Sequence, residues 1–203
     1  MLALLIIEYL KVRRNYDYRE KFKRQFKPVV SHVKDTSQVL DGSGASVMVI
    51  HNNKIVIEEY WEKHSKAPDA IPIQEETQFH VASVRKSYIG FAVAYAIHHG
   101  YIESIDDEVN KYLPVKYTEL FKNTTIRHLL THTHGLNTEE GKIIREFASG
   151  HSWAYRDMGI ELLTQIVKLT TGKTIAQILR EQVFKPLEFN ESGWHDEANE
   201  KLV

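Results

Sequence analysis

A serine and a lysine stand three residues apart in the first half of the chain, a spacing that can build a nucleophile. Ser83 and Lys86 begin an apolar run that continues to His99, which predicts a helix buried around most of its circumference. Residues three apart share a helix face, so the Lys86 amine would reach the Ser83 hydroxyl. Loss of hydration would lower the pKa of Lys86 and let the neutral amine accept the serine proton. An exposed helix start capped by serine is the alternative interpretation of this motif.

A β-hairpin is predicted just before this helix. Two β-rich runs, 46–51 and 54–60, are joined by Asn52-Asn53, a pair that tolerates the positive φ angles of a two-residue turn. An isolated two-stranded hairpin is marginally stable, so helices or further strands should pack against it.

The first forty residues are predicted to be helical. Phe22 and Phe26 lie four apart, as one helix face requires, and Pro28 should interrupt the pattern before a second, short helix. The basic residues of this segment could contact an anionic surface, although a solvated helix face explains them as well. The apolar stretch 1–7 is too short to span a bilayer and lacks a cleavage site. A cytoplasmic location is therefore favoured over export, with a degenerate export signal as the alternative.

Composition narrows the classes of function. The 203 residues include 42% hydrophobic and 26% charged residues with a net charge of -1, which is typical of a globular protein and gives no sign of a nucleic-acid surface. The absence of cysteine excludes disulfides, thiol nucleophiles and thiolate metal sites.

Further helices are predicted after Gly100, which should end the Ser83 helix. They are a short helix within 102–113, a helix from Thr125 through Leu130 stopped by Gly135, one at 158–169 and one at 174–184. Asp106 and Asp107 are interpreted as caps of the first of these helices rather than as catalytic carboxylates.

Several stretches, taken in order, resemble the serine β-lactamase and penicillin-binding-protein superfamily, and within it the branch of class C β-lactamases, related esterases and D-Ala-D-Ala peptidases. They are the hairpin, 77–86 (TQFHVASVRK), 102–114 (IESIDDEVNKYLP), 125–136 (TIRHLLTHTHGL) and 183–187 (VFKPL). His134 stands where that branch usually has serine or alanine. The ordered set is more specific than any one motif.

The resemblance implies an α+β fold of the β-lactamase/transpeptidase type, with a mostly helical region and an N-terminal β-hairpin. We expect one incomplete domain over 1–203, divided into a helical segment at 1–40, the hairpin at 44–62 and the helical region at 77–195. The family's third motif, K-T-G or H-x-G, supplies an oxyanion-hole N–H from a later strand. Lys173-Thr174 is followed by isoleucine, so we expect the chain to be truncated before that motif, with the C-terminal sheet strands missing.

The family's second motif, Y-x-N, is matched by Tyr155-Arg156-Asp157. The resemblance assigns Tyr155 to proton exchange with Ser83, and the Lys86 cation would favour its phenolate. Asp157 replaces the asparagine and takes its substrate-binding position. A carboxylate cannot donate a hydrogen bond to a substrate carbonyl, and it would hold Lys86 protonated, which works against a lysine base.

Three histidines at short spacing, His128, His132 and His134, could suggest a zinc site. Their place in the family stretch favours packing and backbone hydrogen bonds instead. No metal and no cofactor is predicted.

Two functions follow as hypotheses. The first is a serine hydrolase acting through an acyl-enzyme on a β-lactam, a D-alanyl peptide or a small ester, with Ser83, Lys86 and Tyr155 as catalytic residues. The second is an inactive, truncated family member that binds a partner or self-associates as a homodimer through the exposed hairpin edge. The partner of the enzyme would be a small-molecule or peptidoglycan-like substrate, with no nucleic acid and no stable membrane span.

Overall fold

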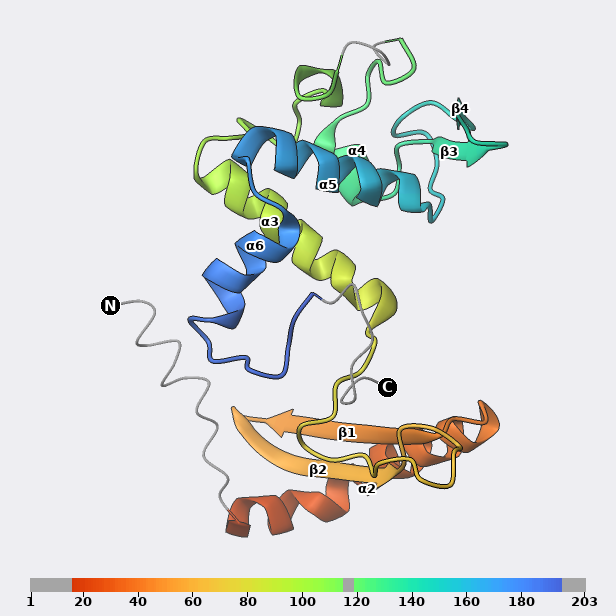
Figure 1. Ribbon diagram of the computed structural model, residues 1–203, viewed down its shortest axis with the longest axis vertical. Coiled ribbons are helices and arrows are strands. Elements are labelled where there is room, and N and C mark those ends of the chain that lie inside the picture. The colour runs from red at the N-terminus through yellow and green to blue at the C-terminus, as the bar shows by residue number, and fades with distance from the viewer. Residues whose placement is uncertain (1–15, 115–118, 195–203) are drawn as a thin grey trace. The chain divides into compact units, whose positions relative to one another are not determined.

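The structure is a computed structural model that describes residues 16–114 and 119–194. The predictions made for stretch 1–7 and for the last residue of the helical region lie outside the described residues. The chain divides into two compact units, one of residues 1–80 and 184–203 and the other of residues 81–183 (Figure 1). No helix among the described residues is both long and apolar enough to cross a membrane.

The first unit combines helix α2 (Tyr16–Val39) with the antiparallel strands β1 (Gly44–His51) and β2 (Lys54–Glu62). The rings of Phe22 and Phe26 meet the His51 ring edge-on, at centroid distances of 4.6 and 5.7 Å. Val30 of α2 and Ile57 of β2 are buried. The predicted aromatic face of the helix is therefore the face that packs against the hairpin.

The predicted break at Pro28 is wrong, because α2 continues through it as one helix. Proline removes one i→i−4 hydrogen bond and typically costs about 3 kcal/mol in a helix interior. Phe22, Phe26 and Val30 lie on either side of Pro28 and pack on the hairpin. Burial of these side chains offsets the lost hydrogen bond, which local sequence rules do not include.

The hairpin turn forms as predicted. Asn52 and Asn53 have φ angles of 47° and 58°, the pattern of a type I′ turn. A bulge interrupts the register between Val49 and Ile50. On β1, Met48 and Ile50 expose 52% and 57% of their surface, so this strand leaves apolar side chains uncovered.

The second unit is built on α3 (Arg85–His98), preceded by the 3₁₀ turn η1 (Ala82–Val84), and on α5 (Asp157–Thr171). The short helices α4 (Ile126–Leu130) and α6 (Ile175–Leu179) complete it. Helix α5 packs against both α3 and α4, and α6 packs on α3 (Figure 1). The fully buried apolar side chains of this core include Val93, Ile102, Phe121, Ile126, Leu129, Leu136, Leu163, Ile166, Ile178 and Leu179.

Helix α3 departs from the prediction of a helix buried on most sides. Ile89, Ala92, Val93 and Ala96 are buried, whereas Phe91 exposes 40% of its surface. Only one stripe of the helix faces α5 and α6, so apolar composition overestimated its burial.

Three further local predictions need correction. The short helix expected within 102–113 is a single 3₁₀ turn, η2 (Val109–Lys111). The helix expected at 174–184 is α6, followed by a π-helical turn at Arg180–Phe184. A second hairpin, β3 (Leu136–Glu139) and β4 (Lys142–Arg145), was not predicted. Its strands are short and partly charged, and only Gly141 in the turn signals it.

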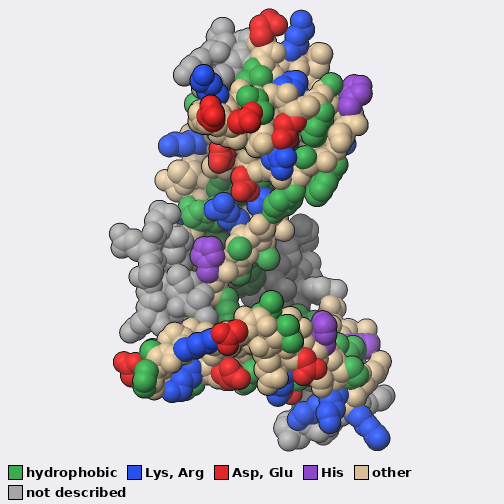
Figure 2. Space-filling view, turned by 90° about the vertical axis from the view of Figure 1, so that its right-hand side faces the viewer, with side chains coloured by type: hydrophobic (Ala, Val, Ile, Leu, Met, Phe, Trp, Pro, Cys, Tyr) green, Lys and Arg blue, Asp and Glu red, His purple; other side chains and the backbone are tan. Residues whose placement is uncertain are grey.

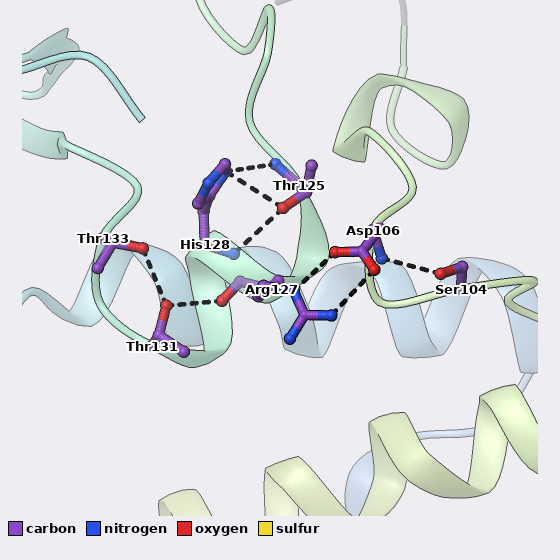
Figure 3. A network of polar contacts seen from close by, with 7 residues as sticks. All are labelled: Ser104, Asp106, Thr125, Arg127, His128, Thr131 and Thr133. Atoms are coloured by element: carbon purple, nitrogen blue, oxygen red, sulfur yellow. Dashed lines mark hydrogen bonds and ion pairs between the residues drawn. The ribbon is translucent and has the colours of Figure 1, made fainter. Parts of the chain in front are cut away.

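Polar contacts fix α4 to the loop before it (Figure 3). Thr125 caps α4, because its hydroxyl accepts from the His128 N–H while the His128 side chain accepts from the Thr125 N–H. Arg127 forms two hydrogen bonds with the Asp106 carboxylate, at 2.6 and 2.9 Å. Asp106 therefore pairs with an arginine rather than capping a helix. Asp107 accepts from the Ser104 N–H, so it caps the turn at 104–107.

Candidate active site

Ser83 lies in the 3₁₀ turn that leads into α3. The first N–H groups of a helical segment have no acceptor within it, and the Ser83 N–H belongs to this first turn. The preceding residue, Ala82, has a φ of 41°. Alanine rarely adopts this left-handed conformation, which typically costs about 1–2 kcal/mol. The backbone is therefore strained immediately before the serine.

The structure brings the three predicted catalytic side chains together. The Tyr155 hydroxyl donates to Ser83 Oγ at 2.8 Å, and Lys86 Nζ donates to the same oxygen at 3.1 Å. Lys86 Nζ also lies 4.8 Å from the centre of the Tyr155 ring. Ser83 and Lys86 come from the start of α3, whereas Tyr155 comes from the segment that enters α5. Packing of α3 against α5 thus assembles the cluster.

Asp157 is the first residue of α5, and its Oδ1 lies 3.1 Å from Lys86 Nζ. The hydrogen bond with Tyr155 raises the pKa of Lys86, and the Asp157 carboxylate raises it further, against the opposing effect of burial. The expectation that burial lowers the pKa of Lys86 is therefore wrong, whereas the expectation that Asp157 holds Lys86 protonated agrees with the raised pKa. The oxygens of Tyr155 and Asp157 stabilise the Lys86 ammonium by more than the loss of hydration destabilises it.

Tyr155 shows the complementary shift. Hydrogen bonds with Lys86 and Ser83 lower the pKa of its phenol, which agrees with the expectation that the lysine cation favours the phenolate. The site is open within the described residues, because Tyr155 exposes 47% of its surface and the nearby Trp153 exposes 63%. Tyr155 is thus the group of this cluster best suited to accept a proton from Ser83.

The three histidines occupy different environments. His128 caps α4, and the His132 ring lies against Tyr155 with centroids 4.7 Å apart. His134 is fully buried against Gly159 of α5. No group of three or more His, Asp or Glu side chains among the described residues is placed to hold a metal ion.

His134 is held as a neutral imidazole. Its Nδ1 accepts the Leu136 N–H at 3.0 Å, so the ring proton lies on Nε2, for which no partner exists among the described residues. Burial lowers the pKa of His134 to about 4. His134, which stands where the resemblance implies serine or alanine, is therefore a buried polar side chain with one hydrogen-bonding atom unsatisfied.

Sequence analysis did not identify the role of two arginines, Arg145 and Arg156, that support the site. The Arg145 guanidinium donates to several acceptors, including His134 O and Ser149 Oγ, both at 3.0 Å. Arg156 forms two hydrogen bonds with Glu146, at 2.9 and 3.1 Å. Arg145 contacts His134 of the stretch 125–136, and Arg156 lies between Tyr155 and Asp157. In the sequence, however, their positive charge alone does not distinguish them from arginines on a solvated surface.

The fold and the cluster of serine, lysine and tyrosine define an α+β protein of the β-lactamase/transpeptidase type. The family model described as "Beta-lactamase" matches residues 32–202, and the chain belongs to this family.

Known relatives and structures agree with this assignment. An uncharacterised protein of Alkalihalophilus pseudofirmus is 63% identical over 179 residues, which are 88% of this chain and 52% of that protein. The esterase EstB of Burkholderia gladioli is 27% identical over 167 residues, covering 65% of this chain and 42% of EstB. A class C β-lactamase solved in complex with cefoxitin has a TM-score of 0.77 at 22% identity, covering 91% of this chain and 55% of that one. The chain thus spans about half the length of the curated relatives it matches.

Proposed function

We propose that this protein is a serine hydrolase that acts through an acyl-enzyme, with Ser83 as the nucleophile. The observation that carries the proposal is the convergence of Tyr155 OH and Lys86 Nζ on Ser83 Oγ, at 2.8 and 3.1 Å. A hydroxyl becomes a useful nucleophile when an adjacent base takes its proton in the transition state. Family membership makes this chemistry the first to test.

Tyr155 is the proposed base, because its pKa is lowered while that of Lys86 is raised. The phenolate takes the Ser83 proton as Oγ attacks the carbonyl carbon, and the Ser83 N–H donates to the developing oxyanion. Tyr155 then returns the proton to the leaving nitrogen or oxygen as the bond to it breaks. Water hydrolyses the acyl-enzyme by the same proton route in reverse. Lys86 remains an ammonium and stabilises the phenolate electrostatically.

The substrate class includes esters and amides with a reactive carbonyl, namely β-lactams, D-alanyl peptides and small esters. One matched relative is named an esterase and one matched structure is a class C β-lactamase, so both the ester and the β-lactam classes occur among the matches. Asp157 lies at the proposed substrate-binding position, 3.1 Å from Lys86. It would accept hydrogen bonds from a substrate amide N–H but repel a substrate carboxylate.

The test is intact-mass analysis after exposure to a fluorophosphonate and, separately, to a penicillin. A single adduct that is absent from Ser83→Ala would support Ser83 as the nucleophile. Assays of ester and β-lactam hydrolysis would then assign the substrate class. Failure to form an adduct on protein with the circular dichroism of a folded chain would refute the hydrolase proposal.

A second function, self-association of an inactive scaffold, is favoured by the hairpin. Within the described residues β1 pairs only with β2, so its other edge carries no strand, and Met48 and Ile50 of that strand are exposed. An open edge with apolar side chains is a template for pairing with a second copy.

Sedimentation equilibrium over a wide concentration range tests this second proposal. A dimer that is weakened by Ile50→Lys, but not by the matched exposed change Ile71→Lys, would support pairing at β1. A monomer at all concentrations would exclude it.

A further inference from the structure

Three contacts connect His132 to the short segment that carries Tyr155. The imidazole ring lies against the Tyr155 ring at a centroid distance of 4.7 Å and an interplanar angle of 36°. The His132 carbonyl accepts the Ala154 N–H at 3.1 Å. Its Nδ1 accepts the Arg156 N–H at 3.5 Å, which is a long hydrogen bond. His132 therefore contacts Tyr155 itself and the residues on both sides of it.

Besides Ser83 and Lys86, which contact the hydroxyl and the ring of Tyr155, His132 is the neighbour that packs its own ring against the phenol. Tyr155 exposes 47% of its surface, and its remaining aromatic neighbour, Trp153, lies 6.5 Å away between ring centroids and exposes 63%. An exposed tyrosine ordinarily samples several side-chain rotamers. A flat ring packed against one face of the phenol removes part of that freedom, and aromatic pairs at this separation are favourable.

The backbone of His132 indicates that the local structure holds this residue in a demanding conformation. Its φ is 56°, in the left-handed region that glycine and asparagine adopt most readily. The same residue ends the turn after α4, where the His132 N–H donates to the Leu129 carbonyl at 3.4 Å. Helix α4 thus presents the imidazole to the segment that leads into α5.

We propose that His132 is a positioning residue, whose ring holds the Tyr155 hydroxyl on Ser83 for proton transfer. This inference rests on the proposed function, because positioning matters only if Tyr155 exchanges a proton with Ser83. The required alignment is tight: a displacement of about 1 Å can cost on the order of a hundredfold in rate. His132 touches no reacting atom and acts through Tyr155.

Two substitutions separate positioning from a merely structural role. His132→Asn removes the ring but suits the positive φ, whereas His132→Phe keeps a flat ring but fits that backbone less well. If His132 were only structural, His132→Asn would be the better variant in both stability and acylation. If the ring positions Tyr155, His132→Phe will be acylated faster despite being less stable.

The experiment measures the rate of Ser83 phosphonylation by a fluorophosphonate across pH, together with urea unfolding. We expect His132→Asn to lower the maximal rate about ten- to a hundredfold with little change in reagent binding. His132→Phe should recover most of that loss, and the exposed matched control His151→Asn should react like the wild type. Acylation of His132→Asn at the wild-type rate, or rates that follow the order of stability, would overturn the inference.

A second readout does not depend on activity. The ¹³Cζ NMR signal of Tyr155, assigned by its absence in Tyr155→Phe, reports the titration of the phenol. We expect the lowered pKa of Tyr155 to return toward the ordinary tyrosine value in His132→Asn, because the hydroxyl leaves Ser83 and Lys86. An unchanged titration would overturn the inference about His132. If the wild type forms no adduct but the pKa of Tyr155 still differs between the wild type and His132→Asn, the hydrolase proposal is refuted. The contact by which His132 positions Tyr155 would then still stand.

Discussion

At the scale of single residues, Asp157 is the main departure from the family pattern within the cluster. Its carboxylate lies 3.1 Å from Lys86 Nζ and contributes to the raised pKa of that lysine. A carboxylate stabilises the ammonium but offers no hydrogen-bond donor to a substrate carbonyl. The chain thus has the tyrosine that the resemblance implies, and a carboxylate where the resemblance implies an amide.

Asp157→Asn should restore the family motif and increase the rate of Ser83 acylation. The asparagine would donate a hydrogen bond to the substrate, and the pKa of Lys86 should fall toward its ordinary value because one anionic neighbour is lost. We expect roughly a fivefold increase with a penicillin, since one hydrogen bond contributes about 1 kcal/mol. Stopped-flow or mass-spectrometric acylation rates measure this. Asp157→Ala removes the charge without adding a donor, and an equal increase in that variant would contradict the role of the donor.

His134 predicts how stability depends on pH. Burial holds its pKa at about 4 in the folded protein, against the ordinary value of 6.5, so only the unfolded chain binds the proton between these values. Stability should therefore be fully retained above pH 6.5 and fall as the pH drops toward 4. At about 1.4 kcal/mol per pKa unit, the loss in the free energy of unfolding reaches roughly 3.5 kcal/mol. Urea unfolding at several pH values measures it.

The matched variants for this prediction are His134→Ser and His151→Ser. The first should show a smaller loss of stability between pH 6.5 and 4, and the second, at an exposed position, should behave like the wild type. Burial also lowers the pKa of His128, so some dependence should remain in His134→Ser. An unchanged slope in that variant would show that the pH dependence arises elsewhere.

At the scale of secondary-structure elements, β4 matters because of the arginine at its end. Arg145 donates hydrogen bonds to the carbonyls of Leu120 and His134 and to the hydroxyls of Thr124 and Ser149. These acceptors belong to the loop before α4, the turn after it and the segment after β4. One partly buried guanidinium therefore joins three pieces of chain around α4.

Arg145→Met should destabilise the protein by about 3–5 kcal/mol, because it leaves several buried acceptors without a donor. Arg145→Lys should recover only part of the loss, since an ammonium cannot reach the same spread of acceptors. Chemical unfolding measures the change. Arg127→Met is the control: its pair with Asp106 is half exposed, so its loss should destabilise the protein far less. Equal losses in Arg145→Met and Arg127→Met would contradict the structural role of Arg145.

At the scale of the whole molecule, charge is balanced. The formal net charge is -1 at pH 7, and Figure 2 shows lysine, arginine and acidic side chains interspersed on the face in view. A molecule near zero net charge lacks the self-repulsion that keeps proteins apart in solution. Self-association is then easiest close to neutral pH.

Solubility should pass through a minimum near the sequence pI of about 6.8. Below this pH the net charge becomes positive, which should increase solubility again. Precipitation by polyethylene glycol between pH 5 and 9 measures this. Solubility that falls steadily on acidification through pH 5 would contradict the charge argument and indicate partial unfolding instead.

Local sequence rules predicted the elements whose signals are local. The type I′ turn at Asn52-Asn53, the start of α4 at Thr125 and the end of α3 before Gly100 all follow from short-range backbone preferences. The resemblance to a known family added the order of the motifs and the pairing of Ser83 with Tyr155, 72 residues apart.

Tertiary structure decided what depends on contacts between distant residues. Packing carried α2 through Pro28, and the contacts of Lys86 with Tyr155 and Asp157 decided that its pKa is raised, although burial alone would lower it. The supporting contacts of Arg145 and His132 likewise come from segments that meet only in the fold. Residue types and spacing thus determined which groups could do chemistry. Their protonation and orientation were set by neighbours that a linear sequence does not reveal.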